Sequence, residues 1–233
     1  MHDILILGGG LVGNSLACAL ENSGLQVGLV EASLPSTGAP GFNERKLALS
    51  ASSLIALERL SVSQHFANGF SPIRRIHISR TGDFGSVDIQ AKDYRREYFG
   101  GVVLARDLGT ALETRVAELK NLVIYRPAKV LGVTPDAKSP SVLIERDGKQ
   151  QTISARMLIG ADGTQSMVRS ALNIATDDFD YRQHLFVCSL QTDQVSDGTA
   201  YERFSSQGPV ALLPMPGGHY GAICGVELEQ VNH

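Results

Sequence analysis

The chain has 233 residues, of which 43% are hydrophobic and 19% are charged, and its formal net charge is −3. This composition is typical of a soluble globular protein and offers no basic stripe of the kind that binds nucleic acid. No apolar stretch reaches the roughly 20 residues of a membrane-spanning helix. The apolar segment 1–8 is too short for the core of a signal peptide.

The start of the chain has the order strand, glycine turn, helix, strand. Residues 3–7 form a short apolar run, which is typical of a strand buried on both faces in a parallel sheet. Residues 13–23 have helical spacing of apolar residues and lead to Gly24, which predicts the end of a helix. Residues 25–31 resemble a second buried strand. Together these segments predict one βαβ unit.

Helical spacing, strand alternation and turn residues predict the remaining elements. Composition predicts a loop over 32–44, and helical spacing predicts helices over 46–60 and 107–120, the latter with Asp107 as N-cap. A further helix is predicted through Val168 and Leu172. Alternation and turn residues predict a hairpin within 73–90 and strands at 122–125, 128–134, 142–146, 150–154, 157–161, 184–192, 199–204, 209–213 and 219–226.

The glycine turn fits the pattern G-x-G-x-x-G. Gly8 allows a sharp exit from the strand, Gly10 allows a pyrophosphate to approach the backbone, and Gly13 allows the helix to pack against the sheet. The pyrophosphate would then contact free backbone N–H groups at the helix start, including those of Leu11 and Val12. The pattern predicts a nucleotide site because it follows a strand and opens a helix.

An acidic residue completes this nucleotide-binding pattern. Glu31 ends the second strand 18 positions after Gly13, close to the spacing of roughly 20 typical of a carboxylate that binds ribose hydroxyls. The alternative is a glycine turn without function, with Glu31 as a solvated strand end. The βαβ unit alone does not distinguish NAD from FAD.

A second motif lies at 158–169, where an apolar strand leads into Asp162 and Gly163, followed by Ser166 and Arg169. The resulting D-G-x-x-S-x-x-R pattern resembles the second fingerprint of the FAD-dependent aromatic hydroxylases, the group A flavin monooxygenases. In that family the motif lies near the flavin pyrophosphate and is implicated in binding both FAD and reduced nicotinamide. The resemblance thus adds Asp162 and Gly163 to the predicted cofactor site.

Other segments are similar to the same family. The loop 40–49 resembles one that carries a flavin-contacting arginine, here Arg45, and the helix start at 103–108 resembles one whose arginine, here Arg106, faces the cofactor. The resemblance also assigns Val130 a backbone contact with the adenine. Residues 204–214 resemble the ubiquinone-biosynthesis hydroxylases, and the loop 40–49 is closest to the 2-polyprenyl-6-methoxyphenol hydroxylases.

This resemblance implies an α/β fold of the para-hydroxybenzoate hydroxylase type, with a Rossmann-like, glutathione-reductase-like FAD-binding domain and an inserted β-rich substrate domain. It assigns residues 1–71 and 101–175 to the first domain, and 72–100 and 176–233 to the second. It implies FAD as cofactor, NAD(P)H as co-substrate, and hydroxylation by O2 of a polyprenylated phenol in ubiquinone biosynthesis. A substrate with an apolar polyprenyl tail implies peripheral membrane contact or membership of a ubiquinone-biosynthesis protein complex.

One departure from the family bears on catalysis. A third fingerprint, a Gly-Asp pair followed by an Ala-Ala-His-like stretch, is missing, because Gly82-Asp83 in the predicted hairpin lacks the following pattern. We therefore expect a chain truncated at its C-terminus. The alternatives are a non-catalytic FAD- or ADP-binding fragment or scaffold subunit and, with less support, an NAD-dependent dehydrogenase.

No catalytic base and no metal site follow from the sequence. The six histidines are scattered, which favours structural or surface roles, although His219, Tyr220 and Tyr201 fall in the β-rich part and could line a ring pocket. The cysteines lack metal-ligand or redox spacing, which predicts core packing in a reducing, cytoplasmic compartment: Cys18, Cys188 and Cys224.

Overall fold

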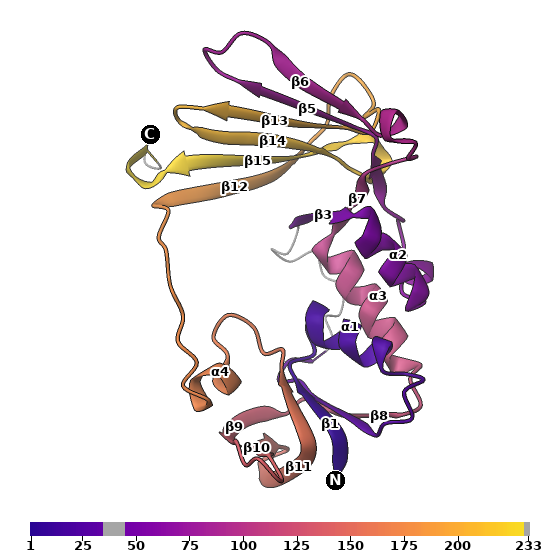
Figure 1. Cartoon of the computed structure of the whole chain (residues 1–233), viewed down its shortest axis with the longest axis vertical. Coiled ribbons are helices and arrows are strands. Elements are labelled where there is room, and N and C mark those ends of the chain that lie inside the picture. Colours follow the sequence, from indigo (N-terminus) through magenta and orange to yellow (C-terminus); the bar gives the residue numbers. More distant parts are fainter. Residues whose placement is uncertain (35–44, 231–233) are drawn as a thin grey trace. The chain divides into compact units, whose positions relative to one another are not determined.

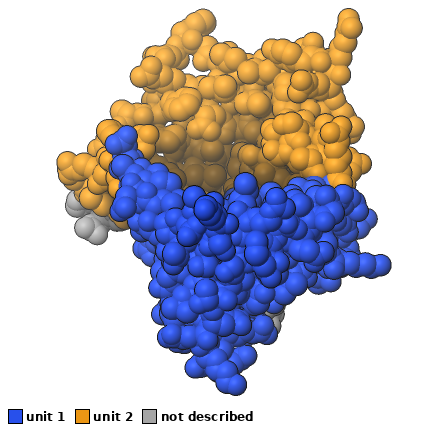
Figure 2. All heavy atoms as spheres, turned by 60° about the horizontal axis from the view of Figure 1, so that its bottom comes forward, with its two compact units in different colours: residues 1–39, 60–65, 109–177 blue, residues 40–59, 66–108, 178–233 orange. Residues whose placement is uncertain are grey.

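The computed structural model describes residues 1–34 and 45–230, which form two compact units (Figure 2). Unit 1 comprises Met1–Ala39, Leu60–His65 and Gly109–Asp177. Unit 2 comprises Pro40–Arg59, Phe66–Leu108 and Asp178–His233. Of the predicted loop over 32–44, residues 35–44 lie outside the described residues.

Unit 1 is built on a six-stranded sheet with the order β8-β2-β1-β11-β10-β9 (Figure 1). The first four strands are parallel, and β11 continues into an antiparallel meander with β10 and β9. The strands are β1 (His2–Leu7), β2 (Val27–Val30), β8 (Leu122–Tyr125), β9 (Lys129–Thr134), β10 (Ser141–Arg146) and β11 (Lys149–Gly160). The helices are α1 (Leu11–Ala19), α4 (Met167–Ala171), η1 (Ser63–His65) and most of α3 (Ala105–Ala117).

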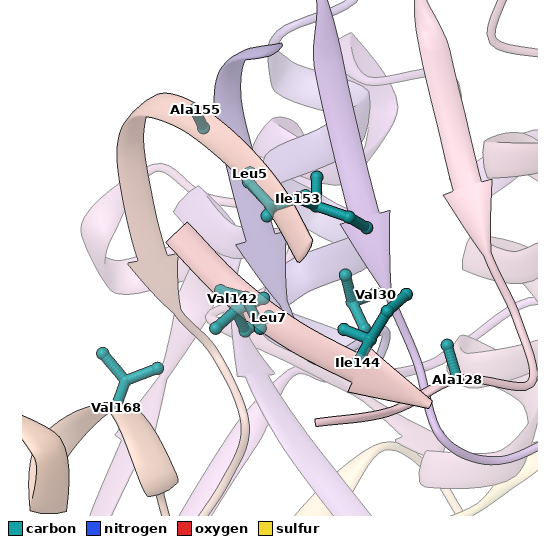
Figure 3. Packing of buried hydrophobic residues seen from close by; sticks show 9 residues of the cluster. All are labelled: Leu5, Leu7, Val30, Ala128, Val142, Ile144, Ile153, Ala155 and Val168. Atoms are coloured by element: carbon teal, nitrogen blue, oxygen red, sulfur yellow. The ribbon is translucent and has the colours of Figure 1, made fainter. Parts of the chain in front are cut away.

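The core of unit 1 lies between the parallel strands and the meander (Figure 3). Alternation places Leu5 and Leu7 on the same face of β1, where they belong to one buried cluster with Val142 and Ile144 of β10, and all four side chains are fully buried. Burial of each such side chain contributes about 1.5–3 kcal/mol. This core fixes the carboxyl ends of β1 and β2, from which the glycine loop and Glu31 emerge.

Unit 2 contains a six-stranded sheet with the order β12-β15-β14-β13-β5-β6 and a three-stranded sheet with the order β3-β7-β4. The strands are β3 (Lys46–Ser50), β4 (Ser71–Ile73), β5 (Arg75–Arg80), β6 (Ser86–Gln90), β7 (Gly100–Leu104), β12 (Gln183–Leu190), β13 (Thr199–Ser205), β14 (Gly208–Pro214) and β15 (Tyr220–Glu227). The helices are α2 (Ala51–Arg59), the first residues of α3, η2 (Ala91–Tyr94), η3 (Pro216–Gly218) and η4 (Leu228–Gln230). A buried cluster joins the two sheets through Ile73, Val102, Ala200 and Met215.

The prediction of one helix over 46–60 is wrong in its first part. Residues Lys46–Ser50 form β3, which pairs antiparallel with β7, and the helix begins only at Ala51. This short segment pairs along one side with β7, a strand distant in sequence, and such pairing overrides local helical spacing.

Three smaller expectations also need correction. Helix α3 begins at Ala105, so Asp107 lies in its first turn and is not the N-cap. Helix α1 ends at Ala19, before Gly24, which adopts a positive φ in the following turn. The strands expected at 150–154 and 157–161 are one strand, β11, because its first half pairs with β10 and its second half with β1.

The cysteines differ in their surroundings. Cys18 is buried in α1, and burial raises the pKa of its thiol to about 11, which confirms a packing role. Cys224 is half-buried, whereas Cys188 is exposed on β12, so the expectation of core packing is wrong for Cys188. Strand β12 is an edge strand in its sheet, and both of its faces are exposed.

The two units divide the chain differently from the predicted domains at 40–59, 66–71 and 101–108, which belong to unit 2, and at 176–177, which belong to unit 1. The functional assignment of the domains stays a prediction. Across residues 1–34 and 45–230, no helix combines the length and apolar character needed to cross a membrane.

Candidate functional site

The carboxyl ends of three strands of unit 1 meet at the glycine loop. Gly8 follows β1, and its N–H donates to the carbonyl of Val30 in β2 at 2.8 Å. The N–H of Ala161, directly after β11, donates to the carbonyl of Leu7 at 2.7 Å. In parallel α/β sheets, ligands bind at this edge, outside the carboxyl ends of the strands.

Each position of the loop is occupied by glycine for a different physical reason. Gly8 has φ +106°, and a Cβ there would lie 2.3 Å from the carbonyl oxygen of Ala161. A Cβ at Gly13 would lie 1.9 Å from the carbonyl oxygen of Gly8. A Cβ at Gly10 would meet no atom within 4 Å. Gly8 and Gly13 therefore serve the fold, whereas Gly10 leaves open space before the helix.

The open space at Gly10 faces the start of α1. Gly10 is the N-cap of this helix and makes no side-chain cap, and its carbonyl accepts the first helical hydrogen bond, from the N–H of Asn14 at 3.0 Å. The earlier N–H groups of an α-helix have no intrahelical partner. Leu11 is half-buried and Val12 is 72% exposed, so their backbone lies at the surface of unit 1. This arrangement fits a pyrophosphate.

Glu31 lies beside the same loop. Its Oε2 accepts the N–H of Gly9 at 2.6 Å, and its Oε1 accepts the N–H of Ser33 at 2.7 Å. Gly9 and Ser33 were not among the predicted site residues. The second glycine of the Gly8–Gly10 run could have indicated the close approach of Gly9 to a side chain, whereas no feature of the sequence indicates Ser33.

The second motif adjoins the first. A Cβ at Gly8 would lie 2.9 Å from the Cα of Asp162, so the structure brings the glycine loop and the Asp-Gly pair together. The carboxylate of Asp162 accepts hydrogen bonds from the hydroxyl of Ser166 at 2.5 Å and from the N–H of Met167 at 2.7 Å. Arg169 donates to the carbonyl of Thr164 at 2.6 Å.

These contacts determine the charge of Asp162. Burial favours its neutral form, but hydrogen bonds from the Ser166 hydroxyl and the N–H of Val168 outweigh burial and hold the pKa of Asp162 below its ordinary value of 3.8. Ser166 also accepts the N–H of Arg169 as N-cap of α4 at 3.0 Å. The motif residues thus fix the shape of the loop that includes Gly163, which has φ +82°.

The other predicted residues lie elsewhere. Val130 of β9 packs against the unit 1 core, two residues after Ala128, whose N–H donates to the carbonyl of Glu31 at 2.8 Å. Arg45 and Arg106 belong to unit 2, where the N–H of Ala105 donates to the carbonyl of Arg45 at 2.9 Å. The cofactor contacts of these three residues stay predictions.

The residues predicted to line a ring pocket belong to unit 2. Tyr201 and Tyr220 line a hollow of about 410 Å³ in unit 2, with ring centroids 6.1 Å apart, and His219 is not among its lining residues. Within the described ranges, no group of three or more His, Cys, Asp or Glu residues could hold a metal ion.

Comparison with known proteins agrees with this geometry. A family profile described as FAD binding domain matches residues 1–227. The chain is 31% identical over 221 residues to ubiquinone hydroxylase UbiL of Rhodospirillum rubrum, an alignment covering 92% of this chain and 49% of the relative. It is 32% identical over 229 residues to the mitochondrial ubiquinone biosynthesis monooxygenase COQ6 of Caenorhabditis elegans, an alignment covering 92% of this chain and 50% of the relative.

Solved structures show the same fold. The p-nitrophenol 4-monooxygenase PnpA of Pseudomonas putida DLL-E4 matches with a TM-score of 0.78 at 16% identity, covering 97% of this chain and 58% of that one. The predicted α/β fold class is confirmed. The chain spans about half the length of the curated relatives it matches.

Proposed function

The chain belongs to the FAD-binding domain family, and from this premise we propose that it serves an aromatic monooxygenase of ubiquinone biosynthesis. The observation that carries the proposal is the contact of Gly8 with Asp162, which joins the two nucleotide-binding motifs at one sheet edge. A βαβ unit of an NAD-dependent dehydrogenase does not require the second motif, and the family match sets that alternative aside.

The residues at this edge fit the ADP half of FAD. The N–H groups at the start of α1 would bind the pyrophosphate, and the open space at Gly10 lets it approach. Each oxygen of Glu31 has a second lone pair beyond the one used by Gly9 or Ser33, and these would accept the ribose hydroxyls. Bound FAD would supply the redox and oxygen chemistry.

The other site and domain assignments form part of the same proposal. Residues 1–71 and 101–175 would hold FAD, and 72–100 and 176–233 would hold the substrate. Arg45 and Arg106 would contact the cofactor with guanidinium groups, which suit phosphate oxygens. Val130 would contact the adenine through its backbone.

The substrate and the setting are inferred from the relatives. UbiL and COQ6 carry names that place them in ubiquinone biosynthesis, and this supports a polyprenylated phenol as substrate, with NAD(P)H as reductant. We place the protein in the cytoplasm. Because a polyprenyl tail would reach the protein from a membrane surface, we add peripheral membrane contact. A complex with other proteins of the pathway would serve the same transfer.

The test compares FAD retention with turnover. The purified chain should bind FAD and show phenol-stimulated oxidation of NAD(P)H with oxygen uptake. FAD binding without phenol-stimulated turnover would favour the second candidate, an FAD-binding part that does not catalyse by itself. Failure to bind FAD would refute both candidates.

A further inference from the structure

One carboxylate interrupts an apolar row in the six-stranded sheet of unit 2. Glu202 of β13 lies directly opposite Ile78 of β5 and Ala211 of β14. The row continues from Ala211 to Ile223 of β15 and then to Val187 of β12. Directly opposite residues of neighbouring strands share a face of the sheet, so aliphatic side chains flank Glu202 on both sides.

The Glu202 carboxylate is unpaired in the part of the chain that the structure describes. No hydrogen bond or ion pair to it occurs within residues 1–34 and 45–230. The residue is half-buried, and burial raises its pKa. A carboxylate that is partly removed from water without a partner costs free energy, which a ligand donating a hydrogen bond would recover. Because Glu202 is not fully enclosed, such a ligand can reach it.

The same face offers a surface for a flat apolar group. We call this face, which carries Ala200, Glu202 and Phe204, the Ala200 face. At one end, Ala200 is covered by the cluster that joins the two sheets of unit 2. Beyond Glu202 the face is open, since Phe204 is 46% exposed and Val187 is 44% exposed. Exposed apolar surface beside an unpaired carboxylate is suited to an aromatic ring with one hydroxyl, and Ser189 and Arg80 lie on the same face away from the Glu202 row.

A second ionisable group adjoins this face, but it is inaccessible. The side chain of Lys46 passes Gly221 of β15, where a Cβ would lie 2.7 Å from its Cγ. Its Nζ is buried and has no hydrogen-bond partner among the described residues. Because this amino group is enclosed by protein, a ligand contact is assigned to Glu202 and not to Lys46.

We propose that Glu202 accepts a hydrogen bond from the hydroxyl of a phenol whose ring lies on the open part of the Ala200 face. This inference rests on the proposed function and names the residue that orients its substrate. The proton stays on the phenol, because a phenol has a pKa of about 10 and a glutamic acid one of about 4.3. Glu202 thereby sets which ring carbon faces the oxidant.

The experiment compares a phenol with its methyl ether on the intact chain without FAD. The probes are 2-methoxyphenol and 1,2-dimethoxybenzene, titrated by NMR chemical-shift changes. The wild type should bind the phenol about tenfold more tightly, the preference expected from a hydrogen bond to a charged acceptor. Glu202→Leu should abolish the preference and leave ether binding unchanged. Glu58→Gln, an exposed carboxylate change on α2 of the same unit, should change neither.

The pH dependence adds a second readout. The preference for the phenol should fall as pH drops through the pKa of Glu202, and Glu202→Gln should show a smaller preference without this dependence. Equal binding of the two probes by the wild type, or an undiminished preference in folded Glu202→Leu, would overturn the inference. If Glu202→Leu does not fold, an unchanged pH dependence in Glu202→Gln would overturn it. FAD binding, measured separately, shows whether the proposed function fails as well.

Discussion

Glu31 Oε2 accepts the backbone N–H of Gly9 at 2.6 Å, which ties the end of β2 to the glycine loop. The two residues are in close contact, because a Cβ at Gly9 would lie 3.0 Å from the Cβ of Glu31. The carboxylate that we assign to the ribose thus also holds the backbone that we assign to the pyrophosphate. One side chain positions both halves of the nucleotide site.

Replacing Glu31 with alanine should therefore reduce both stability and affinity. Two backbone N–H groups, of Gly9 and Ser33, lose their acceptor, and we expect the free energy of unfolding to fall by about 1–3 kcal/mol. FAD affinity should fall at least ~10-fold, because the ribose hydroxyls also lose their acceptor. Urea denaturation and flavin fluorescence titration measure the two effects. Glu145→Ala, an exposed change on β10, should alter neither value. Unchanged FAD affinity in Glu31→Ala would contradict the ribose assignment.

Two glycines of the loop should separate folding from binding. Gly13→Ala forces a Cβ to within 1.9 Å of a carbonyl oxygen and should lower both the melting temperature and FAD affinity. Gly10→Ala meets no atom within 4 Å and should fold nearly as the wild type, yet lose FAD binding because its methyl group takes the place of the pyrophosphate. Gly132→Ala, also in open space, is the control. Full FAD affinity in Gly10→Ala would place the pyrophosphate elsewhere.

The Asp162 carboxylate, which accepts the N–H of Met167 at the start of α4, should make stability depend on pH in the acid range. Its pKa is lower in the folded protein than its ordinary value of 3.8, so its contribution is present above that value and is lost as pH falls through the folded pKa. Asp162→Asn should lower the free energy of unfolding at neutral pH by about 1–2 kcal/mol and weaken its acid dependence. Denaturation curves measured from neutral to acid pH check this. An identical acid dependence in wild type and Asp162→Asn would refute it.

Removing the amino group of Lys46 should stabilise the protein. The Nζ is buried without a hydrogen-bond partner among the described residues, and an apolar side chain of similar length avoids that cost. We expect Lys46→Met to raise the free energy of unfolding by about 1–3 kcal/mol. Chemical denaturation measures this, with exposed Lys92→Met as the control. A destabilised Lys46→Met would show that the amino group contributes a favourable interaction.

Local patterns in the sequence sufficed for the βαβ unit. The strand at 3–7, the glycine turn and Glu31 follow one another within a short segment, so residue spacing predicts their contacts. The Asp-Gly pair at Asp162 required a family resemblance, because its contact with Gly8 joins segments far apart in the chain. Periodicity alone does not identify such partners.

The two errors in strand assignment share a physical cause. Residues Lys46–Ser50 are a strand because β7 provides partners, and β11 is continuous because β10 and β1 pair with its two halves. Local sequence contains no information about these partners. The same reason conceals Glu202, whose neighbours Ile78 and Ala211 become visible only once the strand register is known.

The central claim is that backbone N–H groups at the start of α1, together with Glu31, bind the ADP half of FAD. Competition against bound FAD, followed by flavin fluorescence, tests it most directly. The account predicts that ADP displaces FAD from the wild-type chain and that FMN, which lacks the adenylate, does not. Displacement by FMN but not by ADP would contradict it.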